Sequence, residues 1–332
     1  MLTDWLDWTL EGKPASHRSG PLPSGHYTLH GPGILELTPE SLGANPHACV
    51  FSAAIHGNET APVELLGELL AQIEAGMMSL GSPVLVILGN LPALRQGKRF
   101  INTNLNRLFQ RGLGLEGNEP ARARELMTQL DQFYQRHALL PALHYDLHTA
   151  IRTSLYPRFV VEPFAVSDTA YEQWWWLAGA GIQAVLHQHQ QSWTFSHYSK
   201  HYHGAQAFTF ELGRVAPFGA NDLDALRPML ALLSALAGAQ TPDAQPPDSM
   251  VFFRVEQEIM RQSHAFTLCF DEDIPNFTVF PSGTLLAKDA QAGAFKVGET
   301  PLHVVFPNAR VEIGARAALL VTPVEGSHSK IF

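Results

Sequence analysis

Residues 55–62, Ile-His-Gly-Asn-Glu-Thr-Ala-Pro, constrain the fold of this chain more than any other stretch. They follow an apolar run at 49–54 and precede a helical pattern at 63–75. The stretch is therefore predicted to form the turn that leaves the carboxyl end of a strand and enters a helix. Open α/β sheets bind their ligands at such edges, so the turn marks a candidate site.

His56 and Glu59 stand three residues apart on this predicted turn. Both are residue types that bind zinc, and a catalytic site of the His₂Glu kind needs one further His and leaves the fourth position to water. A single His-x-x-Glu is weak support in a chain with 16 histidines. The alternative is a capped turn that carries a surface His.

A second histidine, His148, ends the apolar run at 142–148. A strand there would bring it to the same sheet edge as His56 and Glu59, which makes it the candidate third ligand. Asp146 is placed to hold the ring of a ligand histidine by hydrogen bonding its other nitrogen. The alternative is a solvated His on a loop.

Glu211 follows a run of aromatic and Thr residues at 205–210. If the run is a strand, the carboxylate is held at the sheet edge and partly desolvated, which raises its pKa toward the range of a general base. The alternative is a strand-end Glu in solvent. The stretch 99–107 adds Arg99, Arg107 and several Asn side chains, which suit anion binding, although a polar surface loop would read the same way.

The whole-chain properties limit the classes of function. The 332 residues suffice for a catalytic domain and a smaller one. A net charge of -9 argues against nucleic acid as a partner, but a local Arg cluster can still bind an anionic small molecule. The two cysteines indicate no disulfide framework, and no signal peptide or membrane span is recognisable, so we expect a cytoplasmic protein with no membrane partner. Self-association as a homo-oligomer is left open.

The element pattern divides the chain into three parts: a catalytic α/β domain at 1–240, a Pro-rich linker at 241–248 and a small all-β domain at 249–332. Strands of the first domain are predicted at 25–30, 33–37, 49–55, 83–90, 142–148, 158–162, 183–187 and 205–211. Helices are predicted at 62–75, 119–137, 168–178 with Ser167 or Asp168 as its cap, and 221–237 with Pro228 near its start. Short strands of the last domain are predicted at 250–255, 266–270, 278–281, 284–287, 303–306 and 317–321.

Four elements in this order carry a family resemblance: His56-Gly57-Asn58-Glu59, Asn104-Leu105-Asn106-Arg107, Asp146-Leu147-His148 and Glu211-Leu212-Gly213. The chain resembles the aspartoacylase and succinylglutamate desuccinylase family of zinc carboxypeptidase-like hydrolases over about residues 48–240, with a β domain beyond. The residues around these elements, at 97–100, 146–152 and 201–207, resemble the desuccinylase branch most. The aspartoacylase branch has Asp where this chain has Asn104, which weakens the carry-over of aspartoacylase specificity.

The resemblance implies a carboxypeptidase-like mixed, mostly parallel sheet flanked by helices. It implies one Zn²⁺ per subunit on His56, Glu59 and His148, with Glu211 as catalytic acid and base and Arg99 polarising the scissile carbonyl. Asn106 and Arg107 would bind the α-carboxylate of the amino-acid part.

We therefore expect zinc-dependent hydrolysis of N-succinylglutamate to succinate and glutamate, the last step of arginine degradation by the succinyltransferase route. This substrate carries three carboxylates, and Arg152, near the third ligand in sequence, is a further candidate to bind one. The alternatives are a deacylase of another N-acyl amino acid such as N-acetylaspartate, an enzyme that acts on a peptide C-terminus, and a non-catalytic binding module.

Overall fold

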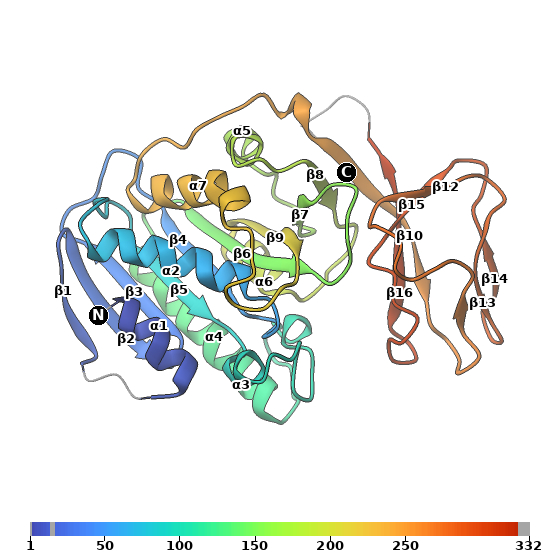
Figure 1. Cartoon of the computed structure of the whole chain (residues 1–332), viewed down its shortest axis with the longest axis horizontal. Helices are drawn as coiled ribbons and strands as arrows, with labels where there is room; N and C mark the ends of the chain where they lie inside the picture. The colour runs from blue at the N-terminus through green and yellow to red at the C-terminus, as the bar shows by residue number, and fades with distance from the viewer. Residues whose placement is uncertain (1, 14–16, 325–332) are drawn as a thin grey trace.

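One mixed β-sheet runs through the computed structural model, which describes residues 2–13 and 17–324 (Figure 1). Its strands are β1 (Ser19–Leu22), β2 (Gly25–Gly31), β3 (Ile34–Pro39), β4 (Ala48–Ala53), β5 (Val84–Leu88), β6 (Ala142–Ala150), β7 (Arg158–Glu162), β8 (Ala184–His187), β9 (Gln206–Arg214), β10 (Val251–Met260), β12 (Thr278–Phe280), β15 (Leu302–Val305) and β16 (Arg316–Pro323). Their order is β1-β2-β3-β5-β4-β6-β9-β7-β8-β10-β16-β15-β12. The central strands β5, β4, β6 and β9 are parallel, so their carboxyl ends meet at one edge.

Helices cover both faces of this centre (Figure 1). They are α1 (Leu2–Glu11), α2 (Ala61–Glu74), α3 (Leu91–Arg95), α4 (Asn118–Arg136), α5 (Tyr171–Gly179), α6 (Phe195–His203) and α7 (Arg227–Ala237), with single turns η1 (Leu105–Arg107), η2 (Asp224–Leu226) and η3 (Pro247–Ser249). Helices α1, α2, α5 and α7 share a core with Phe51 and Val86, whereas α4 and α6 share a core with Val50 and Leu85. Successive strand residues point to opposite faces, so strands covered on both faces are apolar throughout. The predicted mixed α/β fold is confirmed.

The C-terminal β structure continues the main sheet. β10 pairs in parallel with β8, and β16, β15 and β12 follow it antiparallel. Strands β11 (Thr267–Leu268), β13 (Leu285–Asp289) and β14 (Gly293–Lys296) form a separate small sheet. Phe159 of β7 and Phe253 of β10 belong to one apolar cluster, so the two parts share packing as well as hydrogen bonds. The domain boundary at 241–248 stays a prediction. None of the helices in the described part of the chain combines the length and apolarity that a bilayer crossing requires.

The local predictions differ from the structure at several places, among them the helix predicted at 221–237, which begins at Arg227. Helix α5 begins at Tyr171 rather than at 168, because Thr169 bonds to Glu162 and the Ala170 amide donates to Gln206 Oε1 instead of entering a helix. Residues 195–203, for which no element was predicted, form helix α6. Thr194 caps it by accepting a hydrogen bond from the His197 amide. Helix α1 and strand β14 have no counterpart in the predicted elements.

A buried ion pair ties β7 to α6. Lys200 Nζ lies 2.8 Å from Glu162 Oε1, and His187 and Thr169 contact the same carboxylate. Burial alone would raise the pKa of Glu162, but the Lys200 charge and these hydrogen bonds lower it to about 2. Because the folded-state pKa lies below the ordinary glutamate pKa of 4.5, this carboxylate stabilises the fold above pH 4.5, and the contribution is lost as the pH falls toward 2.

Glu162→Gln is expected to lower the free energy of unfolding at pH 7 by about 3 kcal/mol, because Lys200 is left buried without a counter-charge. Urea unfolding measures this, and the difference from the parent should shrink as the pH is lowered below 4.5. Asp224→Asn removes an exposed ion pair with Arg227 and should cost less than about 1 kcal/mol. Equal losses in the two variants would contradict the assignment.

Candidate metal and catalytic site

The turn between β4 and α2 is shaped by its residue types. A Cβ on Gly57 would lie 2.1 Å from the backbone nitrogen of Leu94, so only glycine lets the turn pack against α3. The Gly57 amide donates to the carbonyl of Arg99 at 3.1 Å, which fixes the start of the 98–118 segment against the turn. Pro62 lies in the first turn of α2, where its missing N–H costs nothing. His56 and Glu59 are therefore held on a short, tightly packed connection.

The three predicted metal ligands come together at this turn. Parallel pairing of β4 with β6 brings His148 to the same sheet edge. His56 Nδ1 lies 2.9 Å from Glu59 Oε1, and His148 Nδ1 lies 2.8 Å from Glu59 Oε2. One ligand atom from each residue lies within 4.8 Å of the other two, and all three side chains are buried.

The remaining ring nitrogens have partners of their own. His56 Nε2 donates to Asn104 Oδ1 at 3.0 Å, and His148 Nε2 donates to Asp146 Oδ2 at 3.0 Å. Both Nδ1 atoms are thereby left facing Glu59, which is the orientation that metal-bound histidines take when a second group holds the other nitrogen. Two imidazoles and one carboxylate in this arrangement fit a divalent cation of the zinc type.

Asp146 belongs to a longer buried hydrogen-bond chain. Ser52 Oγ donates to Asp146 Oδ1 at 2.5 Å, so its oxygen accepts from His144 Nε2 at 2.8 Å. Burial lowers the pKa of His144 to about 4, so the ring is neutral and its Nδ1 accepts from Ser199 Oγ at 2.7 Å. The chain links the ring of His148 to strand β4 and helix α6.

Ser52→Ala is expected to weaken metal binding about 10-fold, because Asp146 loses a donor and holds His148 less firmly. Competition against a chromophoric chelator measures the affinity. Ser234→Ala is a matched control, since the buried Ser234 hydroxyl has no hydrogen-bond partner among the described residues. Unchanged affinity in Ser52→Ala would show that His148 is held without this chain.

Glu211 lies beside the cluster. It is paired in register with His148 across β9 and β6. Its carboxylate is buried, and Oε2 has no hydrogen-bond partner among the described atoms. Burial, followed by the nearby charge of Glu59, raises the pKa of Glu211 to about 8. An unengaged carboxylate with a raised pKa at this point suits proton transfer.

Arg99, Asn106 and Arg107 also reach this edge of the sheet. Arg99 Nη1 lies 2.9 Å from Glu59 Oε1. Asn106 Nδ2 lies 3.4 Å from His148 Nε2, and Asn106 Oδ1 accepts from the Phe195 amide. Arg107 is exposed, yet desolvation by its surroundings, followed by the charges of Arg316 and Arg99, lowers its pKa to about 10.

Arg152 is engaged elsewhere. Its Nη1 lies 2.8 Å from Asp273 Oδ1, its Nη2 lies 3.3 Å from Glu272 Oε2, and its Nε donates to the Pro307 carbonyl at 2.8 Å. All three partners belong to the C-terminal β structure. The substrate role of Arg152 stays a prediction, and the contacts that the structure gives it are those of a tie between the two parts of the chain.

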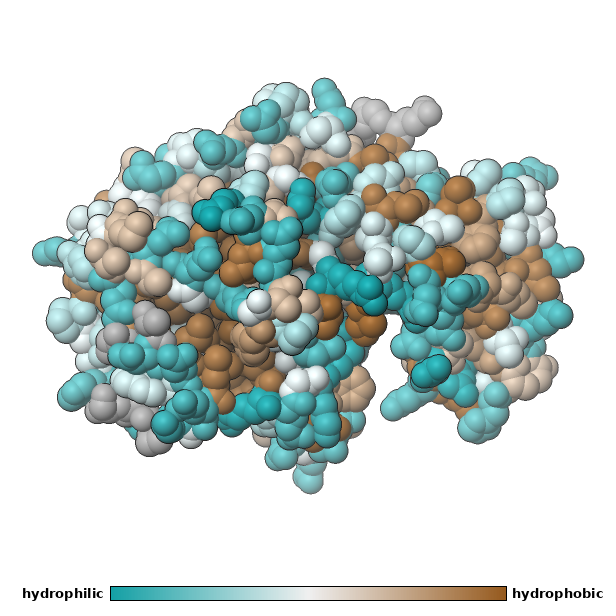
Figure 2. All heavy atoms as spheres, in the orientation of Figure 1, coloured by the Kyte–Doolittle hydropathy of each residue, from teal (hydrophilic) through white to brown (hydrophobic). Residues whose placement is uncertain are grey.

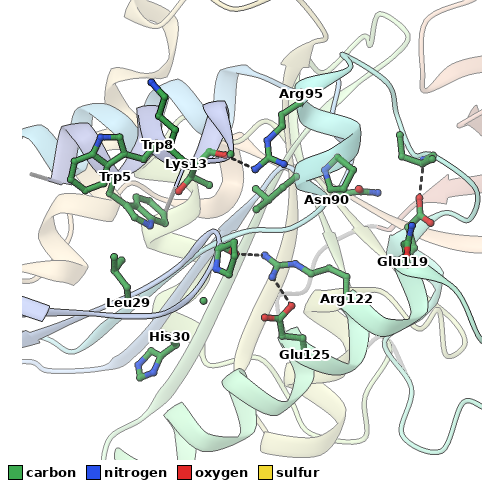
Figure 3. A pocket seen from close by; sticks show the side chains of 18 of the residues that line it. Trp5, Trp8, Lys13, Leu29, His30, Asn90, Arg95, Glu119, Arg122 and Glu125 are labelled. Carbon is green, nitrogen blue, oxygen red and sulfur yellow. Dashed lines mark hydrogen bonds and ion pairs between the residues drawn. The ribbon is translucent and has the colours of Figure 1, made fainter. Parts of the chain in front are cut away.

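A separate cavity of about 980 Å³ lies between α1, the β2–β3 hairpin, α3 and α4 (Figure 3). Figure 3 shows Arg95 and Arg122 pointing at backbone groups of its walls. Arg95 donates to the carbonyls of Thr9 and Leu10, and Arg122 donates to three further carbonyls. These guanidinium groups connect α1 and the hairpin to the rest of the domain, and none of the residues of the His-Glu-His cluster lines this cavity.

Comparison with known proteins identifies two family domains. Residues 46–237 match the succinylglutamate desuccinylase/aspartoacylase catalytic domain, and residues 248–324 match the AstE/AspA barrel-sandwich hybrid domain. Among curated relatives, a protein of Yersinia enterocolitica named succinylglutamate desuccinylase is 36% identical over 98% of each chain. One of the same name from Pseudomonas aeruginosa is 38% identical over 96% of this chain and 98% of that protein.

Solved structures agree with these matches. The succinylglutamate desuccinylase of Vibrio parahaemolyticus superposes with a TM-score of 0.89 at 33% identity, covering 97% of this chain and 95% of that one. The enzyme of Chromobacterium violaceum gives 0.84 at 35% identity over 97% and 98%. Murine aminoacylase 3, at 16% identity and a TM-score of 0.56, shares the fold. The chain therefore belongs to the succinylglutamate desuccinylase/aspartoacylase family.

Proposed function

We propose that this protein hydrolyses the amide bond of N-succinylglutamate to give succinate and glutamate. The observation that carries the proposal is the free, buried carboxylate of Glu211 in register with His148 of the His-Glu-His cluster. Relatives that bear the desuccinylase name over their full length support the choice of substrate. The reaction would close a route of arginine degradation through succinylated intermediates in the cytoplasm.

His56, Glu59 and His148 would hold the cation, and their types favour zinc. When bound, this cation supplies Lewis-acid chemistry that polarises a water molecule and the amide carbonyl. Glu211 takes a proton from the attacking water and later gives it to the leaving nitrogen of glutamate. The same carboxylate can make both proton transfers, because Glu211 lies beside His148 in the sheet.

The cations of the site have separate roles. Arg99, next to Glu59, donates to the carbonyl oxygen as negative charge develops on it, a form of stabilisation that is often large in acyl transfer. Arg107 binds the α-carboxylate of the glutamate part in a bidentate fork, and Asn106 adds a neutral donor. Arg152 is assigned no substrate contact in this proposal, because its guanidinium donates hydrogen bonds to Asp273, Glu272 and the carbonyl of Pro307.

Proton NMR of product release tests the proposal on N-succinylglutamate, N-acetylaspartate, N-acetylglutamate and a C-terminal dipeptide. We expect succinate from the first substrate and far slower release from the others. A preference for an acetylated substrate would keep the amide chemistry and overturn the substrate. The absence of turnover on all four by zinc-loaded protein would overturn the proposed reaction.

A further inference from the structure

A residue that binds a carboxylate of the substrate can also come from the C-terminal β structure. Figure 2 shows a notch between the helix-covered body and this β structure, and in Figure 1 the loops after α3 face β10 and β16 across it. Arg316 is the first residue of β16 and pairs with Met260 of β10. Its Nη1 lies 3.2 Å from Glu258 Oε1, and about three quarters of its side chain is buried.

A connected path joins Arg316 to the predicted substrate residues. Gln190 Nε2 donates to the other oxygen of Glu258 at 3.0 Å. The same loop continues to Trp193, whose carbonyl accepts from the Phe109 amide at 3.2 Å. It then enters α6, where the Phe195 amide donates to Asn106 Oδ1 at 3.0 Å. The loop 188–194 therefore connects η1 to the Arg316–Glu258 pair.

Arg107 is the guanidinium group of this region that lacks a carboxylate partner. It donates to the backbone carbonyl of Asn106, and no carboxylate of the described residues lies within ion-pair distance of it. Arg99 is paired with Glu59, and Arg316 is paired with Glu258. Arg316 and Arg99 are close enough to oppose the positive charge of Arg107, and Glu258 partly offsets them. Three guanidinium groups with two carboxylates favour an anionic ligand.

We propose that Arg316 binds a second carboxylate of the substrate, the side-chain carboxylate of the glutamate part. The inference rests on the proposed function and extends it by adding a specificity residue from the β structure. The hydrogen bonds of the loop 188–194 connect Arg316 to η1, which carries Arg107, the residue proposed to bind the glutamate α-carboxylate. Glutamate carries its second carboxylate on the same side of the scissile bond, whereas the succinyl carboxylate lies beyond the carbonyl.

The test compares kcat/KM on N-succinylglutamate, N-succinylglutamine and N-acetylglutamate. Parent activity on the first compound is established before any variant is judged, so that failure of the reaction itself is recognised separately. Arg316→Ala should reduce kcat/KM on N-succinylglutamate by roughly 100-fold, mainly through KM, because a charge-assisted bidentate contact is lost. The neutral glutamine analogue should change by less than about 3-fold, since it never made that contact. Arg316→Lys should recover part of the loss on the charged substrate alone.

Two matched variants separate binding from structure. Arg254→Ala removes an arginine of the neighbouring strand β10, one paired with Glu256, and should leave kcat/KM on all three substrates unchanged. Glu258→Gln removes the ion pair of Arg316 but keeps its guanidinium, so activity on N-succinylglutamate should be kept or increased. If Arg316→Ala lowered kcat/KM on the two succinyl compounds but not on N-acetylglutamate, Arg316 would bind the succinyl carboxylate. That result would overturn the assignment to the glutamate side chain. Equal losses on all three substrates, or the same loss in Glu258→Gln, would overturn the whole inference.

Discussion

Glu211→Gln is expected to lower kcat by about 10³- to 10⁴-fold while the protein keeps its metal and its fold, since positioned acid–base catalysis contributes on this order. The amide keeps the size of the side chain but cannot accept the proton from water. It also leaves the three cluster residues untouched, since Glu211 is not among them. Steady-state kinetics on N-succinylglutamate, metal content and thermal unfolding measure the three quantities separately.

The pH profile sharpens this prediction. Glu211 must be ionised to act as a base, so activity should rise with pH through its pKa. Burial and Glu59 raise that pKa to about 8, while a cation on the cluster favours the ionised form and shifts the limb to lower pH. Glu172→Gln, on the exposed first turn of α5, is the matched control and should keep the parental profile. If Glu211→Gln kept the rise of activity with pH and a tenth of the parental kcat, Glu211 would not be the group that transfers the proton.

The elements next to the cluster were the most predictable part of the fold. Strand β7 covers the predicted residues 158–162, and α2 differs from its prediction by one residue at each end. Both are bounded by strong local signals, such as Pro62 at the helix start. His56 and His148 could be placed at one edge because parallel strands end on the same side, a rule that needs no side-chain coordinates.

The misses have a tertiary cause. Helix α6 carries three histidines and three aromatic residues in nine positions, so its sequence lacks a clear apolar stripe. Some of its buried polar groups instead have distant partners, as when Ser199 Oγ donates to His144 Nδ1. The alternation of His144, Asp146 and His148 along one face of β6 was the available signal for that buried chain. No sequence signal marked Arg316, because its distance from Arg107 depends on how β10 pairs with β8 and continues the sheet.

His148→Ala is expected to weaken metal binding by more than about 100-fold, because changes in the groups around a ligand alone cost 10- to 100-fold. Activity should fall with metal occupancy, and chelation of the parent protein should reproduce both losses. Metal at 1,000 times its Kd stabilises the fold by about 4 kcal/mol, so the parent should also unfold at a lower temperature after chelation. In His148→Ala this shift should nearly vanish.

His189→Ala is the matched control for the metal ligand. His189 is exposed in the loop 188–194, outside the cluster, so its removal should leave one metal per chain with parental affinity. A fall in metal content in this variant would point to a second ion held by that loop. If His148→Ala still bound one metal tightly, the ion would not be held by the His-Glu-His cluster. The proposed hydrolysis would then lose its geometric basis, because Glu211 is positioned by its register with His148.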